Sequence, residues 1–245
     1  MKALSIFLML ASATVLFVGC SRVGREPSSQ AEQVIRESLS RNGGAKSLQE
    51  ISSISGTALV KLYDNEGQAT IRGQEFTAYP RWGFIQASGR VSGGSWHAYV
   101  TLAGAGVVTS NLDGGLSGPE KQQIEDYLRL ILHRLRGPMN LLGGGEEPGE
   151  VTTVFVASRS MRRIAASGRT DLAKAYFFDE RYRDLRLITD GKDTPPGTGT
   201  VTVLTNQRVD GFLLPVTMEV VDAGRDSLIG ARTRMTVQLQ DVRVR

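Results

Sequence analysis

The chain of 245 residues contains little of the side-chain chemistry on which most enzymes and metal proteins depend. It has one cysteine, Cys20, so a disulfide within the chain is excluded. There are two histidines, His97 and His133, and without a second cysteine a structural zinc site is not expected. Neither a Gly-x-Ser-x-Gly elbow nor a P-loop occurs, and the Gly-Thr-Gly at 197–199 lies in a proline-rich turn. We therefore expect no cofactor, no metal and no enzymatic activity.

The titratable residues that are present show no spacing typical of catalysis. His133 falls within an expected helix and His97 alternates with Trp96, so we expect both histidines at the surface or in packing. Glu146 and Glu147 lie in a glycine-rich stretch, where solvated carboxylates are expected.

Basic residues only slightly outnumber acidic ones, with 29 Lys and Arg against 25 Asp and Glu. The arginines are scattered along the chain rather than grouped in a block, so no nucleic-acid partner is expected. Two interpretations of the excess stay open, a mild attraction to anionic lipid surfaces and a solvated face of mixed charge.

Charge is also missing from residues 3–18, which follow Lys2 as one apolar run. A basic start, an apolar run and small residues before a cleavage point are typical of a secretory signal, and the run is shorter than the roughly 20 residues of a membrane-spanning helix. Val18-Gly19-Cys20 resembles the bacterial lipoprotein signal, the lipobox, although Phe17 stands where that pattern prefers leucine. The resemblance implies removal of residues 1–19 and a covalent diacylglycerol and N-acyl chain on Cys20.

A lipidated Cys20 implies an envelope protein held in the membrane by its lipid anchor, because two or more acyl chains bind a bilayer durably. Ser21 follows the cysteine, whereas aspartate there retains enterobacterial lipoproteins at the inner membrane, so the outer membrane facing the periplasm is expected. Two alternatives stay open, a plain export signal with a stray cysteine and a single-pass anchor that is never cleaved. Residues 20–28 are expected to form the lipidated N-terminus and a short tether.

Residues 29–245 are expected to form a single α+β domain that is mainly β. Capping boxes at Ser29 and Ser117 predict helices over 29–42 and 119–136, and a single helical turn is expected at 45–51. From Ser55 onward the hydrophobic period is near 2, and short connections favour antiparallel neighbours. We expect ten or eleven strands in a curved antiparallel sheet, an incomplete β-barrel with two or three helices in its concave face. After a first strand from residue 55, strands are expected at 69–79, 82–91, 95–103, 106–110, 151–157, 159–166, 173–178, 184–189, 200–208, 212–222 and 231–242, with loops at 143–149 and 190–199.

Three short segments resemble the lipoprotein carrier (LolA/LolB-like) superfamily. They are the entry Asn-Gly-Gly-x-x-x-Leu-x-x-Ile from residue 42, Tyr-Phe-Phe-Asp at 176–179, and Val-Asp-Gly-Phe-Leu-Leu-Pro at 209–215. The resemblance implies an incomplete antiparallel barrel with helices across its mouth, enclosing an apolar cavity for the acyl chains of lipids or lipoproteins. This superfamily divides into soluble carriers and membrane-anchored acceptors. The lipobox puts this chain on the anchored side, which implies receiving or holding rather than shuttling.

The expected helix 119–136 is apolar over more than one face, so we expect the hollow between helix and sheet to bind an apolar ligand. The alternative is that the same residues only form the core, because a helical stripe usually indicates packing. Trp96 follows a Ser-Gly-Gly turn and could be a core residue or lie at a hairpin tip. The candidate lining residues are Trp96, Val100, Leu128, Ile131, Leu135 and Met218.

A different class of function also stays open, a non-catalytic scaffolding lipoprotein that binds a protein partner in the envelope. It would require a continuous apolar patch on the outer face of the sheet, for which Leu59 and Tyr63 are the sequence candidates. The sequence identifies neither the partner nor the ligand.

Overall fold

The computed structural model describes residues 29–41, 43–44, 50–91, 93–104, 106–143, 145–168, 174–190, 199–224 and 228–245. The expected signal peptide at 1–19, Cys20, the tether at 20–28 and most of the helical turn at 45–51 lie outside the described residues. None of the described helices is long and apolar enough to cross a membrane.

Twelve strands form one open antiparallel sheet, in the order β5-β4-β3-β2-β1-β12-β11-β10-β9-β8-β7-β6. Consecutive strands pair with one another except β5 and β6, which form the two edges of the sheet. Strand β12 also pairs with β1, which joins the two meanders. The curved sheet confirms the expected fold class, and its twelve strands correspond to the twelve expected segments, one or two more than the expected total of ten or eleven. The strands are β1 Ile54–Tyr63, β2 Ala69–Tyr79, β3 Phe84–Val91, β4 Gly94–Thr101, β5 Gly106–Ser110, β6 Glu146–Val156, β7 Arg159–Gly168, β8 Ala175–Asp179, β9 Leu185–Asp190, β10 Thr200–Val209, β11 Phe212–Ala223 and β12 Ile229–Val244.

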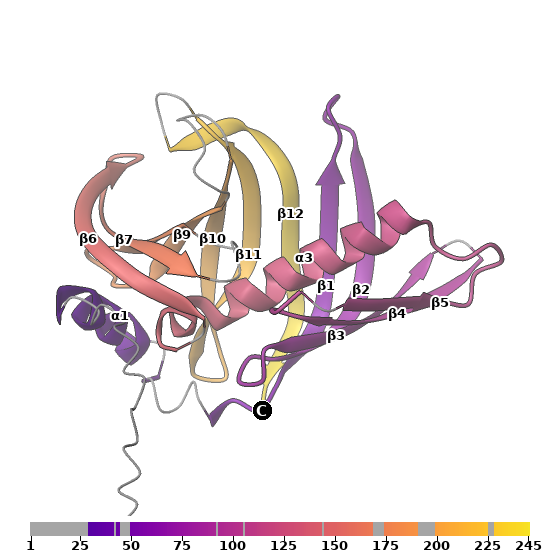
Figure 1. The fold of residues 1–245 in the computed structure, drawn as a ribbon, viewed down its shortest axis with the longest axis horizontal. Coiled ribbons are helices and arrows are strands. Elements are labelled where there is room, and N and C mark those ends of the chain that lie inside the picture. Colours follow the sequence, from indigo (N-terminus) through magenta and orange to yellow (C-terminus); the bar gives the residue numbers. More distant parts are fainter. Residues whose placement is uncertain are drawn as a thin grey trace, which may run out of the picture.

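The sheet bends strongly, and β3, β4 and β5 run across the direction of β1 and β2 (Figure 1). A β-bulge between Ser55 and Thr57, opposite Asp241 with φ of +50°, increases the local twist where β1 pairs with β12. An ideal Cβ on Gly56 would lie only 2.7 Å from the carbonyl oxygen of Gln240, so a larger residue would force the two backbones apart.

Helix α3, Gly118–Arg136, connects the β5 edge of the sheet to the β6 edge and crosses the concave face between them (Figure 1). Its start was predictable, because Ser117 and Glu120 form the expected capping box. The 3-10 helix η1, Gly137–Leu141, continues from its end. Helix α1, Ser29–Arg41, packs its apolar residues near β6 and η1.

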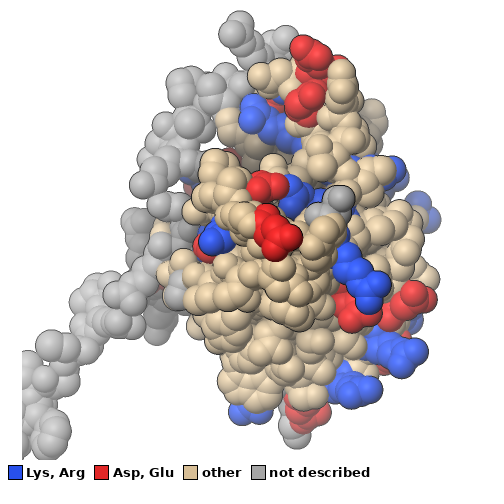
Figure 2. All heavy atoms as spheres, turned by 90° about the vertical axis from the view of Figure 1, so that its right-hand side faces the viewer, with Lys and Arg blue, Asp and Glu red and all other residues tan. Residues whose placement is uncertain are grey.

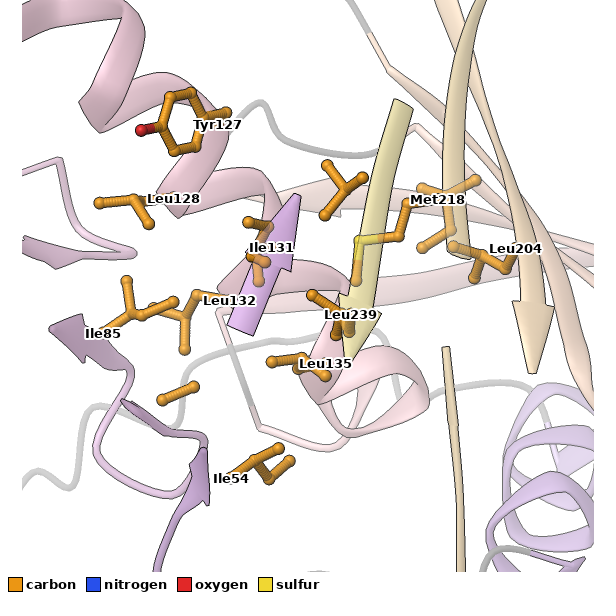
Figure 3. Packing of buried hydrophobic residues seen from close by; sticks show 14 of the residues in the cluster. Ile54, Ile85, Tyr127, Leu128, Ile131, Leu132, Leu135, Leu204, Met218 and Leu239 are labelled. Atoms are coloured by element: carbon orange, nitrogen blue, oxygen red, sulfur yellow. The ribbon is translucent and has the colours of Figure 1, made fainter. Parts of the chain in front are cut away.

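A hydrophobic core fills the space between α3 and the concave face. Ile85 and Ile54 from the first meander and Met218 and Leu239 from the second are fully or almost fully buried there. Strand β8 is buried on both faces, and Phe177 belongs to a second, smaller cluster on the other side of the sheet. Figure 3 shows side chains of α3 converging with those of the sheet, among them Leu128, Ile131, Leu132, Leu135, Met218 and Leu239.

One expectation about the sheet was wrong. Residues 143–149 were expected to form a loop, but β6 begins at Glu146 and pairs with β7 from Gly168. A bulge between Pro148 and Val151 accommodates the proline within the strand.

Candidate functional site

The six residues proposed as a cavity lining lie together in the core beneath α3. Trp96, Val100, Leu128, Ile131, Leu135 and Met218 are all buried and belong to one cluster. Trp96 is only 1% exposed, so it is a core residue and does not lie at a hairpin tip. Its ring packs over Gly89 of the neighbouring strand, where an ideal Cβ would lie 2.6 Å from the ring.

The space between helix and sheet is occupied largely by these side chains themselves. A pocket of about 30 Å³ lies at the carboxyl end of α3, bordered by Leu135, Leu185, Leu204 and Leu214. A space of that size holds about one water molecule. An acyl chain can therefore enter this part of the hollow only if α3 moves away from the sheet.

A buried polar cluster fixes the carboxyl end of α3. His133 Nε2 lies 2.8 Å from Glu146 Oε1 of β6, and both side chains are almost completely buried. The Tyr176 hydroxyl of β8 donates to the second carboxylate oxygen of Glu146. Asn140 of η1 donates to the His133 carbonyl at 2.9 Å. Strand β6 and the 3-10 helix η1 are thus hydrogen-bonded to the last turn of α3, and β8 is connected to it through Glu146.

The hydrogen bonds determine the proton positions in this cluster. Arg134 Nη1 lies 2.5 Å from His133 Nδ1 and can only donate, so Nδ1 is the acceptor and the proton of the neutral ring sits on Nε2. Nε2 then donates to Glu146. Burial lowers the pKa of His133, which keeps the imidazole neutral. Burial, followed by the neighbouring Glu146, raises the pKa of Tyr176 well above its usual value.

The same end of α3 carries a buried charge pair. Arg134 is 2% exposed and pairs with Asp190 of β9, and its Nη2 also donates to Thr202 Oγ1 of β10 at 3.0 Å. Thr202 in turn donates to Asp190 Oδ2 at 3.3 Å. The guanidinium thus has both an anionic partner and a hydroxyl acceptor, as a buried arginine requires.

The structure shows where the glutamates and histidines considered in the sequence analysis lie. Glu146 was expected to be solvated, but it is buried because strand β6 begins there and carries its side chain toward His133. Its neighbour Glu147 is exposed, as expected. His97 lies at the surface and His133 is packed inside the molecule. Among the described residues, no group of three His, Cys, Asp or Glu side chains could hold a metal ion.

The amino-terminal half of α3 covers a different set of polar side chains. The Tyr127 hydroxyl donates to Gln74 Oε1 of β2 at 3.3 Å, and burial raises the pKa of Tyr127. Arg72, two residues earlier on the same face of β2, has its Nη2 3.8 Å from Glu120 Oε1. The sequence analysis did not identify these residues, although Arg72 and Gln74 occupy the alternate positions of β2 that continue into buried Phe76.

The outer face of the first meander carries exposed aromatic side chains. The rings of Tyr79 and Phe84 stack with centroids 4.3 Å apart, and Phe84 lies 5.1 Å from Tyr99. Trp82, which is 58% exposed, lies in the turn between β2 and β3. Val107, which is 61% exposed, lies on edge strand β5 opposite Tyr99. The expected candidates Leu59 and Tyr63 are only partly exposed. We call Tyr79, Trp82, Phe84, Tyr99 and Val107 the outer row.

Charged side chains of both signs are intermingled on the face of the molecule that includes the β5 side. Figure 2 shows basic and acidic groups next to one another there, with broad uncharged areas between them. This face has no extended basic surface of the kind that binds nucleic acid.

No protein-family model matches the sequence, and no curated protein matches it. Among solved structures, a DUF1329 family protein from Desulfovibrio piger ATCC 29098 has a TM-score of 0.53 and 9% identity, covering 87% of this chain and 92% of that chain. An outer membrane lipoprotein-sorting protein domain from Vibrio parahaemolyticus and a LolA superfamily protein from Nitrosomonas europaea each have a TM-score of 0.48, with 9% and 8% identity, covering 88% of this chain and 93% of theirs. The structural neighbours of this chain thus include LolA superfamily and lipoprotein-sorting proteins, and at these identities the likeness is one of fold.

Proposed function

We propose that the protein is a non-catalytic, membrane-anchored lipoprotein of the cell envelope that binds the acyl chains of a lipid or lipoprotein between α3 and the sheet. One observation carries the proposal. Helix α3 lies across the concave face of an open sheet and turns an apolar surface toward it, so the largest apolar interior of the molecule lies beneath a single helix. The lining would comprise Trp96, Val100, Leu128, Ile131, Leu135 and Met218.

Entry of the ligand requires the amino-terminal half of α3 to lift. The carboxyl end is held by directional buried hydrogen bonds from His133 and Arg134. The first half is held mainly by apolar contacts, which an acyl chain can replace at little cost because they are non-directional. The polar contacts of its middle turn are long, since Arg129 donates to the carbonyl oxygens of Thr101 and Gly104 at 3.4 and 3.3 Å.

A reversible disulfide between β5 and α3 tests this movement. An ideal Cβ on Gly106 lies 2.9 Å from Cγ of Glu125, one bond beyond the Glu125 Cβ, so cysteines at the two positions lie within disulfide reach. In the double variant Gly106→Cys/Glu125→Cys, we expect oxidation to abolish uptake of a fluorescent fatty acid and reduction to restore it. Cys20 is the only natural cysteine, and its expected lipidation leaves no other thiol to interfere.

The single variant Glu125→Cys is the matched control, because it removes the same carboxylate without a crosslink. It should take up the fatty acid in both redox states. Uptake by the fully oxidised double variant would show that α3 does not need to move. An absence of uptake by the reduced variant, the control and the natural chain would contradict acyl-chain binding itself.

The anchor is tested separately. We expect mass spectrometry of the N-terminal peptide to find Cys20 as the first residue, carrying diacylglycerol and an N-acyl chain, and the protein to fractionate with the outer membrane. Cys20→Ser should keep residues 1–19 and leave the outer-membrane fraction, because the lipobox resemblance implies that the leader is removed only after the thiol is acylated. Residues 1–19 still attached to the natural chain would instead indicate an uncleaved anchor.

A second candidate, a scaffolding lipoprotein that binds a protein partner, is favoured by the outer row. Exposed aromatic residues are enriched where proteins bind one another, and this row reaches the open edge strand β5. A photo-crosslinking residue at Val107 should then capture one defined envelope protein, and Tyr99→Ala should abolish that product while fatty-acid uptake is unchanged. If the photo-crosslinking residue at position 107 captures no protein in cells, that result contradicts the scaffolding candidate.

A further inference from the structure

Hydrogen-bond donors without acceptors lie buried beneath the amino-terminal half of α3. Gln74 is 2% exposed, and its Nε2 has no hydrogen-bond partner among the described residues. The same holds for the buried Nε and Nη1 atoms of Arg72 within the described part of the chain. Buried polar groups are nearly always hydrogen-bonded in native proteins, so two such side chains on one strand require an explanation.

The charge of Arg72 is poorly compensated by protein groups. The acidic oxygen paired with it is Glu120 Oε1, 3.8 Å from Nη2 and beyond hydrogen-bonding distance. Glu120 is itself 44% exposed on its side chain and accepts hydrogen bonds from the Ser117 amide and hydroxyl at 3.0 and 2.8 Å. Only 13% of the Arg72 side chain is exposed, so its guanidinium has lost most of its contact with water. The distant Glu120 carboxylate does not compensate this desolvation cost.

The geometry of β2 directs these donors into the hollow. Gln74 pairs with Gly89 of β3, and Trp96 of the proposed lining packs on that glycine. Tyr127, one residue before Leu128 on α3, donates to Gln74 Oε1 and thereby leaves the amide nitrogen free to donate elsewhere. The donors thus lie at one end of the proposed lining, with Arg72 nearer to solvent than Gln74.

We propose that Arg72 and Gln74 bind the head group of the ligand, and that the ligand is an acyl lipid with an anionic carboxylate or phosphate head. This inference rests on the proposed function. An anionic oxygen supplies the acceptors that both side chains lack, and hydrogen bonds between a guanidinium and such an oxygen are among the strongest in proteins. Tyr127 acts as a positioning residue by orienting the Gln74 amide. A neutral head group would leave the charge of Arg72 uncompensated.

The test compares three competitors that share one chain and differ in the head group: myristate, myristyl phosphate and myristyl alcohol. Each displaces a neutral fluorescent acyl probe from the full-length protein in mild detergent. We expect the two anions to compete at least about tenfold better than the alcohol. In Arg72→Met this preference should disappear, while competition by the alcohol is unchanged. Preference for only one of the two anions identifies the head group and supports the inference.

Lys61→Met is the matched control, because Lys61 is exposed on β1 opposite Ile71, the residue before Arg72, and its loss removes the same charge. The control should keep the preference for anions. Arg72→Met is expected to fold, since an apolar side chain of similar length replaces a poorly paired charge. Thermal unfolding of the ligand-free variant checks this, and we expect no loss of stability.

Each remaining outcome overturns the inference. If the natural chain binds all three competitors equally, or if Arg72→Met keeps the preference, acyl binding stands but Arg72 does not read the head group. If Lys61→Met also loses the preference, general charge and not the buried site is responsible. If no competitor displaces the probe from the natural chain, the proposed function fails together with the inference.

Discussion

The two ends of α3 are attached to the sheet by different kinds of contact. At the carboxyl end, His133 and Arg134 make short, buried hydrogen bonds to β6, β9 and β10. In the amino-terminal half, Tyr127 at the middle of the helix makes one hydrogen bond of 3.3 Å, and Arg72 and Glu120 are 3.8 Å apart. Apolar packing holds the rest of that half.

This difference indicates which part of the helix can exchange its contacts. A buried polar network requires each donor to meet its own acceptor, so it specifies one arrangement and resists displacement. Apolar contacts have no such requirement and can be made equally well to a ligand. The helix is therefore expected to pivot about its carboxyl end, with the ligand entering beneath its first half.

The largest effect is expected from breaking the network at the fixed end. Arg134→Ala removes a buried guanidinium and leaves the partly buried Asp190 without its cationic partner, which should lower the free energy of unfolding by about 3–5 kcal/mol. Arg129→Ala, on the same helix but with partners nearer the surface, should lower it by no more than about 1 kcal/mol. Urea denaturation measures both. Equal losses would remove the distinction between the two ends.

A cavity made at the middle of α3 should be filled by ligand. Leu128 is fully buried, so Leu128→Ala should cost about 2–4 kcal/mol in the ligand-free protein. A bound fatty acid should stabilise this variant more than it stabilises the natural chain, because it occupies the space that leucine leaves. Leu142→Ala, at a site that is 36% exposed, is the control and should show no such gain. If the ligand stabilises both variants by the same amount, the acyl chain of the ligand does not bind next to Leu128.

The fixed end should weaken in acid because of His133, which faces Glu146, Tyr176 and Arg134. Its pKa is lowered below the ordinary value of 6.5, so the unfolded chain binds a proton first as the pH falls. Stability should therefore decrease below about pH 6.5 by at most about 1.4 kcal/mol per pH unit. His133→Gln should lose this slope between pH 6.5 and the range in which carboxylates protonate. A slope that persists in the variant would assign it to another group.

The smallest effect is expected at the hydrogen bond beneath the first half. Tyr127→Phe removes the donor to Gln74 and should cost no more than about 1 kcal/mol, because a distance of 3.3 Å is longer than the usual O–H···O hydrogen bond. Tyr63→Phe, at a partly exposed site on β1, controls for loss of a hydroxyl and should be near neutral. A cost for Tyr127→Phe as large as that of Arg134→Ala would show that both ends are fixed equally.

Local signals were sufficient to predict most of the fold. The capping box at Ser117 gave the start of α3 to within one residue, because it depends only on residues three apart. The Asp-Gly turn between β10 and β11 has φ of +48° at Asp210 and +89° at Gly211, as a two-residue hairpin of this type requires. The strand expected at 231–242 corresponds to β12, in which alternate residues such as Met235 and Val237 are buried.

The polar contacts of the site could not be predicted, because their partners are distant in sequence. Glu146 follows a run of glycines, and the two groups that bury it are 13 and 30 residues away along the chain. Gln74 and Tyr127 are 53 residues apart. The inward position of Arg72 was visible in the alternation of β2, but only the structure shows which helix covers it.

The position of β12 at the centre of the sheet has a consequence for how the chain folds. Ile54 of β1 pairs with Val244 of β12, so the two meanders cannot join until almost the whole described chain is available. Contacts between such distant segments slow folding, and until they form, β1 and β11 each present an unpaired edge. During synthesis the half-formed sheets are therefore open to aggregation, and the last strand is the one that ends this exposure.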